Sequence, residues 1–313
     1  CIIACGSAMH AGLAGQFLMK KFLHIPVSVE MASEFMYTDP VVDEKTLVIA
    51  VSQSGETIDT LEALKYAKQK GAGSLAVINV KGSSIARESD AVLYTNAGPE
   101  IAVASTKAYT SQLALFALLV ARMAYVRGDF TETETRDFVR ELKRVPDAME
   151  KVLAGKEKIH HIAGRIISAK DIFMIGRGLD YFIAMEGSLK LKEVSYIHSE
   201  AYASGELKHG PLALITEHTP VVAVATQKQL LSKEVSNIRE VRSRGADVVL
   251  FAKEQLMPEE EEGYLTFELP DVRDEFMCLP AAAALQLLAY YVSSDKGYDV
   301  DKPRNLAKFV TVE

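Results

Sequence analysis

The stretch that decides the fold is Ser52-Gln53-Ser54-Gly55-Glu56-Thr57, a short polar turn between two apolar segments. The preceding run, 47–51, reads Leu-Val-Ile-Ala-Val; it is too short for a helix and rich in branched residues, so it predicts a buried strand. Residues 57–67 repeat apolar side chains at helical spacing and lead to Gly71, which predicts a helix that ends before this glycine. A strand, a glycine turn and a helix start in this order are typical of parallel α/β folds.

The turn itself has the composition of an anion-binding loop. It places three hydroxyl side chains and one carboxamide within six residues, directly before a helix N-terminus. Backbone N–H groups and the positive end of a helix dipole hold a phosphate at such a position without any Lys or Arg. An ordinary turn with a Ser or Thr helix cap is the alternative. Because no Lys follows the glycine, this is not an ATP-type P-loop, and we predict a phosphate cradle formed by Ser52, Gln53, Ser54 and Thr57.

Composition and charge narrow the class of protein. The chain has 313 residues, 49% hydrophobic and 25% charged, as expected for a soluble protein of about two domains. Its net charge of −7 and the absence of a basic patch in the sequence argue against a nucleic-acid partner. We find no apolar run long enough to span a membrane and no signal peptide, and expect no membrane partner. The three cysteines lack disulfide or metal-ligand spacing, which favours a reducing cytoplasm.

The chain opens in the middle of a strand-like run, Cys1-Ile2-Ile3-Ala4-Cys5. Domains seldom begin in mid-strand, so we expect this chain to be a fragment of a longer protein. A strand position also gives Cys1 a packing role rather than that of an N-terminal nucleophile.

Two parts of the chain repeat one pattern of strands and helices. The strand and glycine at 2–7 have a counterpart at 172–178, and each is followed by a helical segment. The strand at 47–51 has a counterpart at 221–224. Strands that alternate with helices predict an α/β protein with two tandem doubly wound, flavodoxin-like domains, each with a parallel sheet. The second copy has Ala225-Thr226-Gln227-Lys228 where the first has the cradle, so we expect it to have lost phosphate binding.

The repeat and the charged segment between its copies suggest the domain boundaries. We expect a first domain at 1–128 with the cradle, a helical connector at 129–165, a second domain at 166–300 with the catalytic Glu and His, and a C-terminal tail at 301–313 that completes the active site. Ligands in such folds bind beyond the carboxyl ends of the strands, which is where the cradle falls.

The densest polar segment outside the cradle lies in the second copy. On a helix, Glu186, Lys190 and Glu193 fall on one face, spaced four and three residues apart. Surface ion pairs are the common explanation of this spacing, but the apolar residues around them leave few wet directions. A Glu held near a Lys in a cleft suits proton transfer at a carbon beside a carbonyl. His209 lies in a Lys-His-Gly-Pro turn, as either a plain loop residue or a proton carrier. No His or Cys residues have metal-ligand spacing, so we predict no metal and no cofactor.

Several segments together resemble a known family. They are 52–57, 96–107, 189–197, 206–212 and 303–308. In this order they resemble the isomerase half of the glutamine–fructose-6-phosphate aminotransferases, the glucosamine-6-phosphate synthases, which consists of two sugar-isomerase (SIS) domains. The resemblance covers essentially the whole chain, and motifs in the right order are far more specific than any one of them.

The resemblance implies a role for each site residue. Glu193 matches the base that moves a proton between C1 and C2 of the sugar, and Lys190 matches the lysine beside it that handles protonation of the sugar oxygen. His209 matches the residue that opens the furanose ring from the neighbouring subunit. Lys308 matches the tail lysine that forms a Schiff base with the ketose. The residues that match substrate-binding positions are Ser7, Ser52, Gln53, Ser54, Thr57, Glu100, Val103, Ser105 and Ala307.

The resemblance also implies an activity and partners. We expect conversion of fructose 6-phosphate to glucosamine 6-phosphate by Schiff-base and enolamine chemistry. In the family, a glutaminase domain of the same full-length chain releases the ammonia from glutamine, and two copies form a homodimer with a shared active site. One departure is Ala8, where the family usually has a serine near the phosphate.

Two alternatives stay open at this point. A stand-alone SIS deaminase or deglycase would share the cradle, and a glutaminase domain upstream of Cys1 would argue against it. A non-catalytic sugar-phosphate sensor would bind its effector without turnover. The joint presence of Glu193, His209 and Lys308 argues against a sensor.

Overall fold

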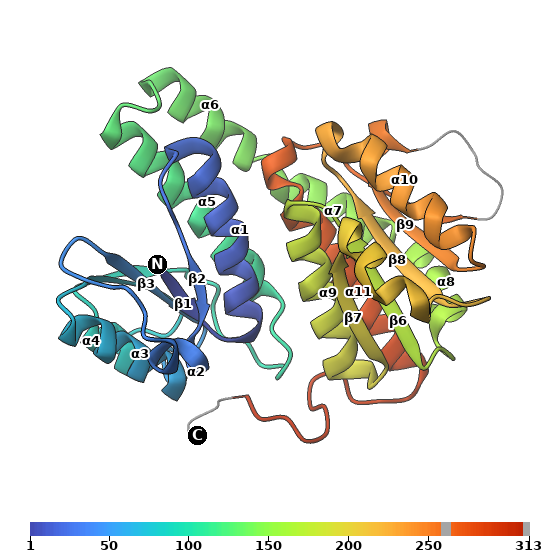
Figure 1. Cartoon of the computed structure of the whole chain (residues 1–313), viewed down its shortest axis with the longest axis horizontal. Helices are drawn as coiled ribbons and strands as arrows, with labels where there is room; N and C mark the ends of the chain where they lie inside the picture. The colour runs from blue at the N-terminus through green and yellow to red at the C-terminus, as the bar shows by residue number, and fades with distance from the viewer. Residues whose placement is uncertain (258–263, 309–313) are drawn as a thin grey trace. The chain divides into compact units, whose positions relative to one another are not determined.

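The computed structural model describes residues 1–257 and 264–308, and the chain divides into two compact units. The first unit comprises residues 1–137 together with 305–308 of the tail, and the second comprises residues 138–304. Each unit contains one five-stranded sheet flanked by helices (Figure 1).

The first unit is built around a parallel sheet with strand order β2-β1-β3-β4-β5. Its strands are β1 (Ile2–Ala4), β2 (Val29–Met31), β3 (Leu47–Ser52), β4 (Gly73–Ile78) and β5 (Ala91–Tyr94). Its helices are α1 (Gly6–Leu23), α2 (Ala32–Phe35), α3 (Ile58–Gln69), α4 (Ser84–Glu88) and α5 (Lys107–Arg127), with a 3₁₀ turn η1 (Met36–Thr38). Helices α1 and α5 pack together on one side of the sheet, and α2, α3 and α4 form a second group on the other side (Figure 1).

The second unit repeats this order as β10-β9-β8-β6-β7, again with parallel pairing. Its strands are β6 (Asp171–Gly176), β7 (His198–Ala203), β8 (Pro220–Ala225), β9 (Asp247–Lys253) and β10 (Leu265–Leu269). Its helices are α7 (Val145–Ala154), α8 (Lys156–Ile166), α9 (Leu179–Ser195), α10 (Leu231–Arg242) and α11 (Cys278–Asp295). Its 3₁₀ turns are η2 (Ser204–His209), η3 (Pro211–Leu214), η4 (Lys228–Leu230), η5 (Glu254–Leu256) and η6 (Asp274–Phe276). Helix α6 (Glu132–Leu142) contains the division between the units, and the predicted tandem parallel α/β fold is confirmed.

The two central strands explain why the candidate site lies where it does. In β3 every residue after Leu47 is buried, and in β8 every residue after Pro220 is buried. Runs of branched apolar residues are what strands covered on both faces require. The strand order reverses between β1 and β3 and between β6 and β8. In open parallel sheets, ligands bind beyond the carboxyl ends of strands at such a reversal.

Two helices contradict the expectation that no apolar run in the sequence is long enough to span a membrane. By length and composition alone, α5 and the segment 274–295 that contains α11 are apolar enough to cross a membrane, so such apolar runs do exist. Their packing accounts for this composition. Helix α5 packs along α1, whereas α11 lies against α7, α8 and α9, with 78% of its apolar window buried. Both helices are therefore packed against other helices of their own units.

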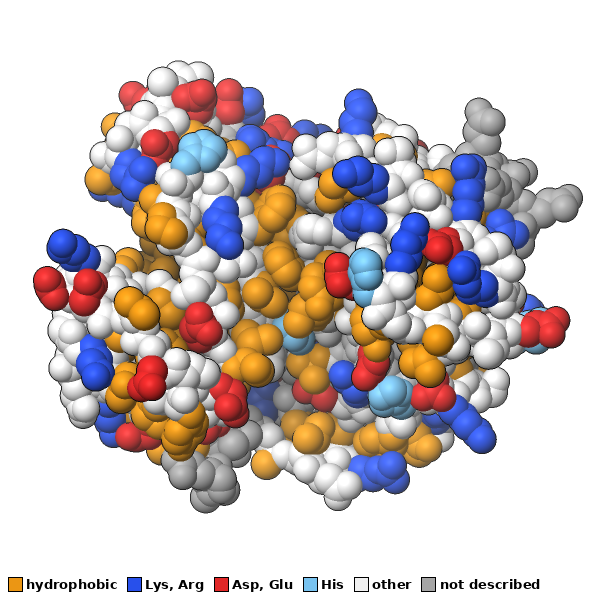
Figure 2. Space-filling view, in the orientation of Figure 1, with side chains coloured by type: hydrophobic (Ala, Val, Ile, Leu, Met, Phe, Trp, Pro, Cys, Tyr) orange, Lys and Arg blue, Asp and Glu red, His pale blue; other side chains and the backbone are white. Residues whose placement is uncertain are grey.

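Charged side chains of both signs are spread over the surface. On the face shown in Figure 2, both Lys and Arg and Asp and Glu side chains are exposed, with the blue side chains more frequent toward the upper right of the view. The net charge of the chain is −7.

Gly187 marks the close packing of α9 on α11. A Cβ added at Gly187 would lie 2.5 Å from Leu285 Cδ1 and 3.2 Å from Met174 Sδ, whereas a Cβ at Gly164 in α8 would meet nothing within 4 Å. We predict that Gly187→Ala lowers the free energy of unfolding by about 1–3 kcal/mol through overpacking. Gly164→Ala should raise it by about 0.5–1 kcal/mol because alanine favours the helix. Urea unfolding measures both, and equal responses of the two variants would contradict this packing.

Candidate active site

The cradle turn between β3 and α3 is shaped by its own hydroxyl groups. Ser52 Oγ lies 3.0 Å from Thr57 Oγ1 and accepts a hydrogen bond from the Gly55 N–H at 2.9 Å. Ser54 Oγ accepts another from the Glu56 N–H at 3.1 Å. Helix α3 begins directly after Thr57, whose side chain makes no capping hydrogen bond, so the alternative of an ordinary capped turn is wrong. The N-terminus of α3, where the helix dipole is positive, is thus not capped by the Thr57 side chain.

A glycine is required at the centre of this turn. Gly55 has φ +68°, and a Cβ there would lie 2.0 Å from Ser83 Oγ. The start of α4 also holds the turn, because the Ile85 N–H donates to the Gly55 carbonyl at 3.0 Å and the Ser84 N–H donates to the Glu56 carboxylate at 2.9 Å. Hydrogen bonds from Ser84 hold the pKa of the Glu56 carboxyl below its usual value. Glu56 is thus engaged within the turn that it belongs to.

Asn79, which the sequence analysis did not single out, joins the cradle to the next loop. Its N–H donates to the Gln53 carbonyl at 3.3 Å, and its Nδ2 donates to the Gly98 carbonyl at 2.8 Å. Its Oδ1 accepts hydrogen bonds from Thr95 Oγ1 at 3.0 Å and from the Ala97 N–H at 2.9 Å. A carboxamide directly after a buried strand is the signal that could have indicated this role.

Glu100 holds the loop that contains Val103 and Ser105. Its buried carboxylate accepts three hydrogen bonds of 2.9 Å, from the N–H and Oγ1 of Thr106 and from the N–H of Ala108. Negative charge is favoured at this position because it meets the first turn of α5. Glu100 therefore fixes the path of the loop that leads into α5.

The tail places Lys308 on the same loop. Lys308 Nζ donates a hydrogen bond to the Ala102 carbonyl at 2.6 Å, and Ala307 beside it is exposed. Both partners belong to the first unit, as does Ser7 in the first turn of α1, which follows the strand next to β3. Residues 309–313 of the predicted tail lie outside the described residues.

The second unit brings Glu186, Lys190 and Glu193 together on α9. Lys190 Nζ lies 3.4 Å from a carboxylate oxygen of Glu186 and 2.5 Å from one of Glu193. The side chains of Glu186 and Lys190 are only 1% and 3% exposed, and that of Glu193 is 22% exposed. The alternative of a solvated surface face is therefore wrong for these residues. The apolar neighbours noted in the sequence reflect this burial.

The two carboxylates keep Lys190 charged. Burial opposes the charge on Lys190, but the nearby carboxylates of Glu186 and Glu193 outweigh it and raise the pKa of the Lys190 ammonium. Lys190 is thus a hydrogen-bond donor at neutral pH and can stabilise negative charge on a ligand oxygen. Glu186, absent from the predicted site, is the buried partner in this arrangement. Glu193 is the more accessible carboxylate and the better placed to accept a proton.

His209 is presented from an anchored turn. It ends η2 and is exposed. At the start of η2, Ser204 Oγ donates to the buried Glu234 carboxylate at 2.8 Å, and Leu207 is buried within the turn. Among the described residues, no hydrogen bond or ion pair engages the His209 side chain. Its ring nitrogens are therefore available to a ligand or to solvent.

The predicted site residues thus fall into two groups, one in each unit. The first unit connects the cradle, through Asn79, to the loop after β5 that also carries the Lys308 contact. The second unit holds the α9 cluster and, separately, His209. Over residues 1–257 and 264–308, no three or more His, Cys, Asp or Glu side chains are grouped so that they could hold a metal ion.

The fold and these groups define a class, that of tandem parallel α/β proteins with a hydroxyl-lined cradle suited to a phosphate. Residues 1–122 and 165–293 match the SIS domain family. Because these ranges include most of both units, the chain belongs to the SIS domain family.

Curated relatives are similar to the chain over its whole length. The glutamine–fructose-6-phosphate aminotransferase (isomerizing) of Caldanaerobacter subterraneus subsp. tengcongensis is 53% identical over 312 residues, which cover 100% of this chain and 51% of the relative. The relative of the same name from Clostridium tetani is also 53% identical over 312 residues, with the same coverage. The chain therefore spans about half the length of the curated relatives it matches.

Solved structures agree with this assignment. The C-terminal domain of glucosamine-fructose-6-phosphate aminotransferase from Francisella tularensis has a TM-score of 0.94 and 42% identity, and the match covers 97% of this chain and 86% of that one. Glucosamine-6-phosphate deaminase from Thermotoga maritima has a TM-score of 0.79 at 24% identity, covering 99% of this chain and 89% of that chain, which shows a shared fold alone. The predicted resemblance to the isomerase half of the aminotransferases is confirmed.

The steric requirement at Gly55 can be tested against a matched glycine. Gly82 also has a positive φ, +70°, but a Cβ there would meet nothing within 4 Å. We predict that Gly82→Ala costs only the backbone strain of about 1–2 kcal/mol, and that Gly55→Ala costs measurably more because of the clash with Ser83. Thermal unfolding gives the stabilities, and calorimetric titration with inorganic phosphate gives the binding. Loss of phosphate binding in Gly82→Ala, or its retention in Gly55→Ala, would contradict this account.

Proposed function

We propose that this chain is the isomerase portion of a glutamine–fructose-6-phosphate aminotransferase and forms glucosamine 6-phosphate from fructose 6-phosphate. The observation that carries the proposal is the buried Lys190–Glu186 pair beside the more accessible carboxylate of Glu193. Burying charges is costly, and a protein that only bound a sugar phosphate would not need such a pair next to an accessible carboxylate. Similarity over the whole chain to enzymes of this name supports the proposal.

The cradle binds the 6-phosphate in the proposed reaction. The phosphate ligands are Ser52, Gln53, Ser54 and Thr57. The positions that line the sugar are Ser7, Val103, Ser105 and Ala307, with Glu100 holding the loop. Hydroxyl groups and main-chain amides at the start of α3 supply the donors that a dianion needs. The binding energy of the phosphate then holds C1 and C2 of the sugar in position for chemistry.

The proposed chemistry proceeds from the closed sugar to the amino aldose. His209 opens the ring by taking the proton of the anomeric hydroxyl and returning one to the ring oxygen. The Lys308 amine adds to the C2 carbonyl with loss of water and forms an imine. Ammonia then replaces the Lys308 amine at C2. Glu193 removes a proton from C1 and delivers it to C2, while the O1 hydroxyl loses its proton and the imine nitrogen gains one, so that the C2 imine becomes an amine and C1 becomes the aldehyde carbon. Lys190 hydrogen-bonds O1 and stabilises the negative charge that develops there.

The proposed partners follow from this activity. Ammonia comes from glutamine in the glutaminase domain of the full-length enzyme. Two copies of the chain form a homodimer with a shared active site, to which the neighbouring subunit contributes its His209. We place the enzyme in the cytoplasm, where its phosphorylated substrate is found and where the reducing conditions keep cysteines as free thiols.

Two other functions use the same fold. A stand-alone sugar-phosphate deaminase or deglycase would turn over without glutamine, and a sensor would bind fructose 6-phosphate without forming an aldose. The assay that separates them uses the full-length protein with glutamine, ammonium or neither. Glutamine-dependent formation of glucosamine 6-phosphate supports the proposal, and its absence in an otherwise active protein favours the alternatives.

The base can be tested by one isosteric change. Glu193→Gln keeps the shape of the side chain but cannot accept a proton, so we predict a loss of isomerisation of at least about 10²-fold with little change in fructose 6-phosphate binding. Glu157→Gln, at an exposed position on α8, serves as the control and should leave both unchanged. Isomerase assays and calorimetry measure the two quantities. Turnover of Glu193→Gln at the parental rate would show that the base is a different residue.

The phosphate ligands can be tested with two substrates. Thr57→Val removes a hydroxyl with little change in volume, and we predict that fructose 6-phosphate binds about tenfold more weakly. Unphosphorylated fructose should bind the variant and the parent equally, because it places no group in the cradle. Thr110→Val, which removes a hydroxyl on α5, is the matched control. An equal effect of Thr57→Val on both sugars would mean that the cradle does not bind the phosphate.

A further inference from the structure

The two sheets allow the repeats to be matched residue by residue. Strands β3 and β8 have the same length, and each pairs on one side with the first strand of its unit. Ile2 lies opposite Ile49 in the first unit, and Met174 lies opposite Val222 in the second. Because Ile49 and Val222 are both the third residue of their strands, Ile2 and Met174 are counterparts.

The backbone after these strands confirms the match. Counting on from Ile2 and Met174 pairs Gly6 with Gly178, and these glycines have φ values of +53° and +57°. From the sequence alone, residues 2–7 were matched only approximately with residues 172–178. The sheet register gives the exact match, in which Ile2 corresponds to Met174. Two residues further on, Ala8 in the first unit is the counterpart of Asp180 in the second.

The carboxyl ends of the next strands follow the same correspondence. Asn79 and Lys253 are counterparts, because each is the seventh residue counted from the aligned starts of β4 and β9. Asn79 Nδ2 donates to the Gly98 carbonyl at 2.8 Å, and Lys253 Nζ donates to the Val272 carbonyl at 2.8 Å. The second unit has therefore kept the architecture of the switch point that holds the cradle in the first.

Asp180 occupies this switch point in the second unit. The counterpart of Gln53 is Thr226, and Thr226 donates two hydrogen bonds to the Asp180 carboxyl group, from its N–H at 2.7 Å and from its Oγ1 at 2.5 Å. Asp180 is only 3% exposed. In the first unit the counterpart of Asp180 is Ala8, whose methyl group can accept no hydrogen bond.

We propose that the carboxyl group of Asp180 is a built-in occupant of the second unit's anion site, in the place that the substrate phosphate takes in the first. Asp180 is then a positioning residue that ties the first turn of α9 to the end of β8. Helix α9 carries Glu186, Lys190 and Glu193, so their placement depends on this tie. The comparison with a phosphate rests on the proposed function, whereas the tie itself rests on the second unit alone.

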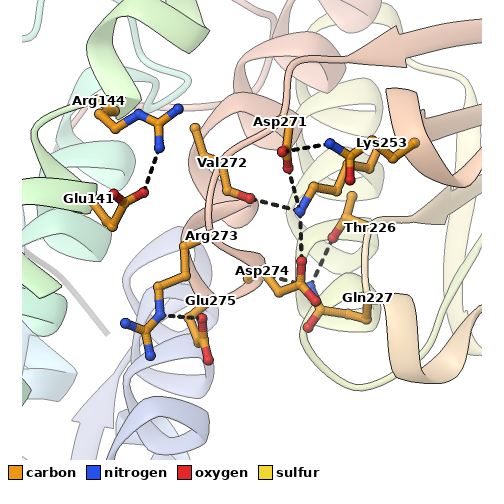
Figure 3. Close-up of polar contacts among 11 residues, drawn as sticks. Glu141, Arg144, Thr226, Gln227, Lys253, Asp271, Val272, Arg273, Asp274 and Glu275 are labelled. Carbon is orange, nitrogen blue, oxygen red and sulfur yellow. Dashed lines mark hydrogen bonds and ion pairs between the residues drawn. The ribbon is translucent and has the colours of Figure 1, made fainter. Parts of the chain in front are cut away.

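Other polar groups at this edge of the sheet are also satisfied by partners within the second unit. Gln227 Nε2 donates to Thr226 Oγ1 at 2.9 Å and to the Asp274 carbonyl at 3.1 Å. Lys253 Nζ lies 2.6 Å from the Asp271 carboxylate and 2.7 Å from that of Asp274. Figure 3 shows Lys253 directed at these acidic groups, with Thr226 and Gln227 beside them. The Lys253 ammonium is thus neutralised by carboxylates of its own unit.

The ionisation of Asp180 sets the conditions for a test. Burial raises the pKa of Asp180 to about 7, against the opposing effect of the hydrogen bonds from Thr226 and the Gln227 backbone. Above this pH the group is predominantly a carboxylate. Asp180→Ala removes that carboxylate and leaves a cavity of the size and donor arrangement of a formate ion.

The test is rescue of Asp180→Ala by formate at pH 8. We expect Asp180→Ala to unfold at a lower temperature than the parent chain, and formate to raise its Tm by about 4 °C or more beyond an equal concentration of chloride. Acetate, which is larger by one methyl group, should act less. The matched control is Asp147→Ala, which removes an exposed aspartate from the first turn of α7 and should respond equally to formate and chloride. Absence of a formate-specific gain in Asp180→Ala overturns the proposal.

Two further measurements keep the test decisive. If Asp180→Ala does not fold, its refolding yield from urea in formate against chloride replaces the Tm, and Asp180→Ser is measured in parallel. In the full-length enzyme, formate should restore kcat of Asp180→Ala while KM for fructose 6-phosphate stays unchanged.

Phosphate titration of the parent chain tests the cradle separately. Formate rescue without any phosphate binding would overturn the proposed function but support the role of Asp180. Phosphate binding without formate rescue would overturn the role of Asp180 but support the proposed function.

Discussion

The contact between Gly55 and Ser83 is the constraint on which the site of the first unit depends. No side chain fits at Gly55, and its positive φ turns the chain so that hydroxyl groups and main-chain amides converge at the start of α3. The start of α4 and the side chain of Asn79 hold this turn from two sides. A cradle that is held open in this way can bind a dianion without paying for its ordering at each binding event.

The two repeats meet one physical problem in different ways. The carboxyl edge of a parallel sheet presents donors at the strand reversal, and an acceptor has to satisfy them. In the proposed function, a ligand phosphate takes this place in the first unit. In the second unit Asp180 accepts the hydrogen bonds of Thr226. Helix α9, which begins at this place in the second repeat, carries a buried lysine between two carboxylates.

Local patterns were sufficient to predict the fold but only part of the site. The run at 47–51 became β3 because its composition and its burial agree, and the polar turn after it became the cradle. The role of Asp180 depends on sheet register, which joins residues far apart in the chain and leaves no local trace, whereas Asn79 had a local signal in its place directly after a buried strand. Glu100 entered the predicted site through resemblance, and its capping of α5 is visible only once the loop has folded back. The burial of Lys190 was predictable because its helical spacing to Glu186 and Glu193 placed the three residues on one face, and the apolar residues around them indicated that this face is covered.

The most direct test of this account is a crystal structure of the full-length protein with glucosamine 6-phosphate bound. The account predicts the phosphate oxygens within about 2.6–3.2 Å of the hydroxyl groups of Ser54 and Thr57. It also predicts C1 and C2 of the sugar within reach of a Glu193 carboxylate. A hexose phosphate bound with its anionic group at the edge of the second sheet, or anywhere remote from Ser54 and Thr57, would contradict it.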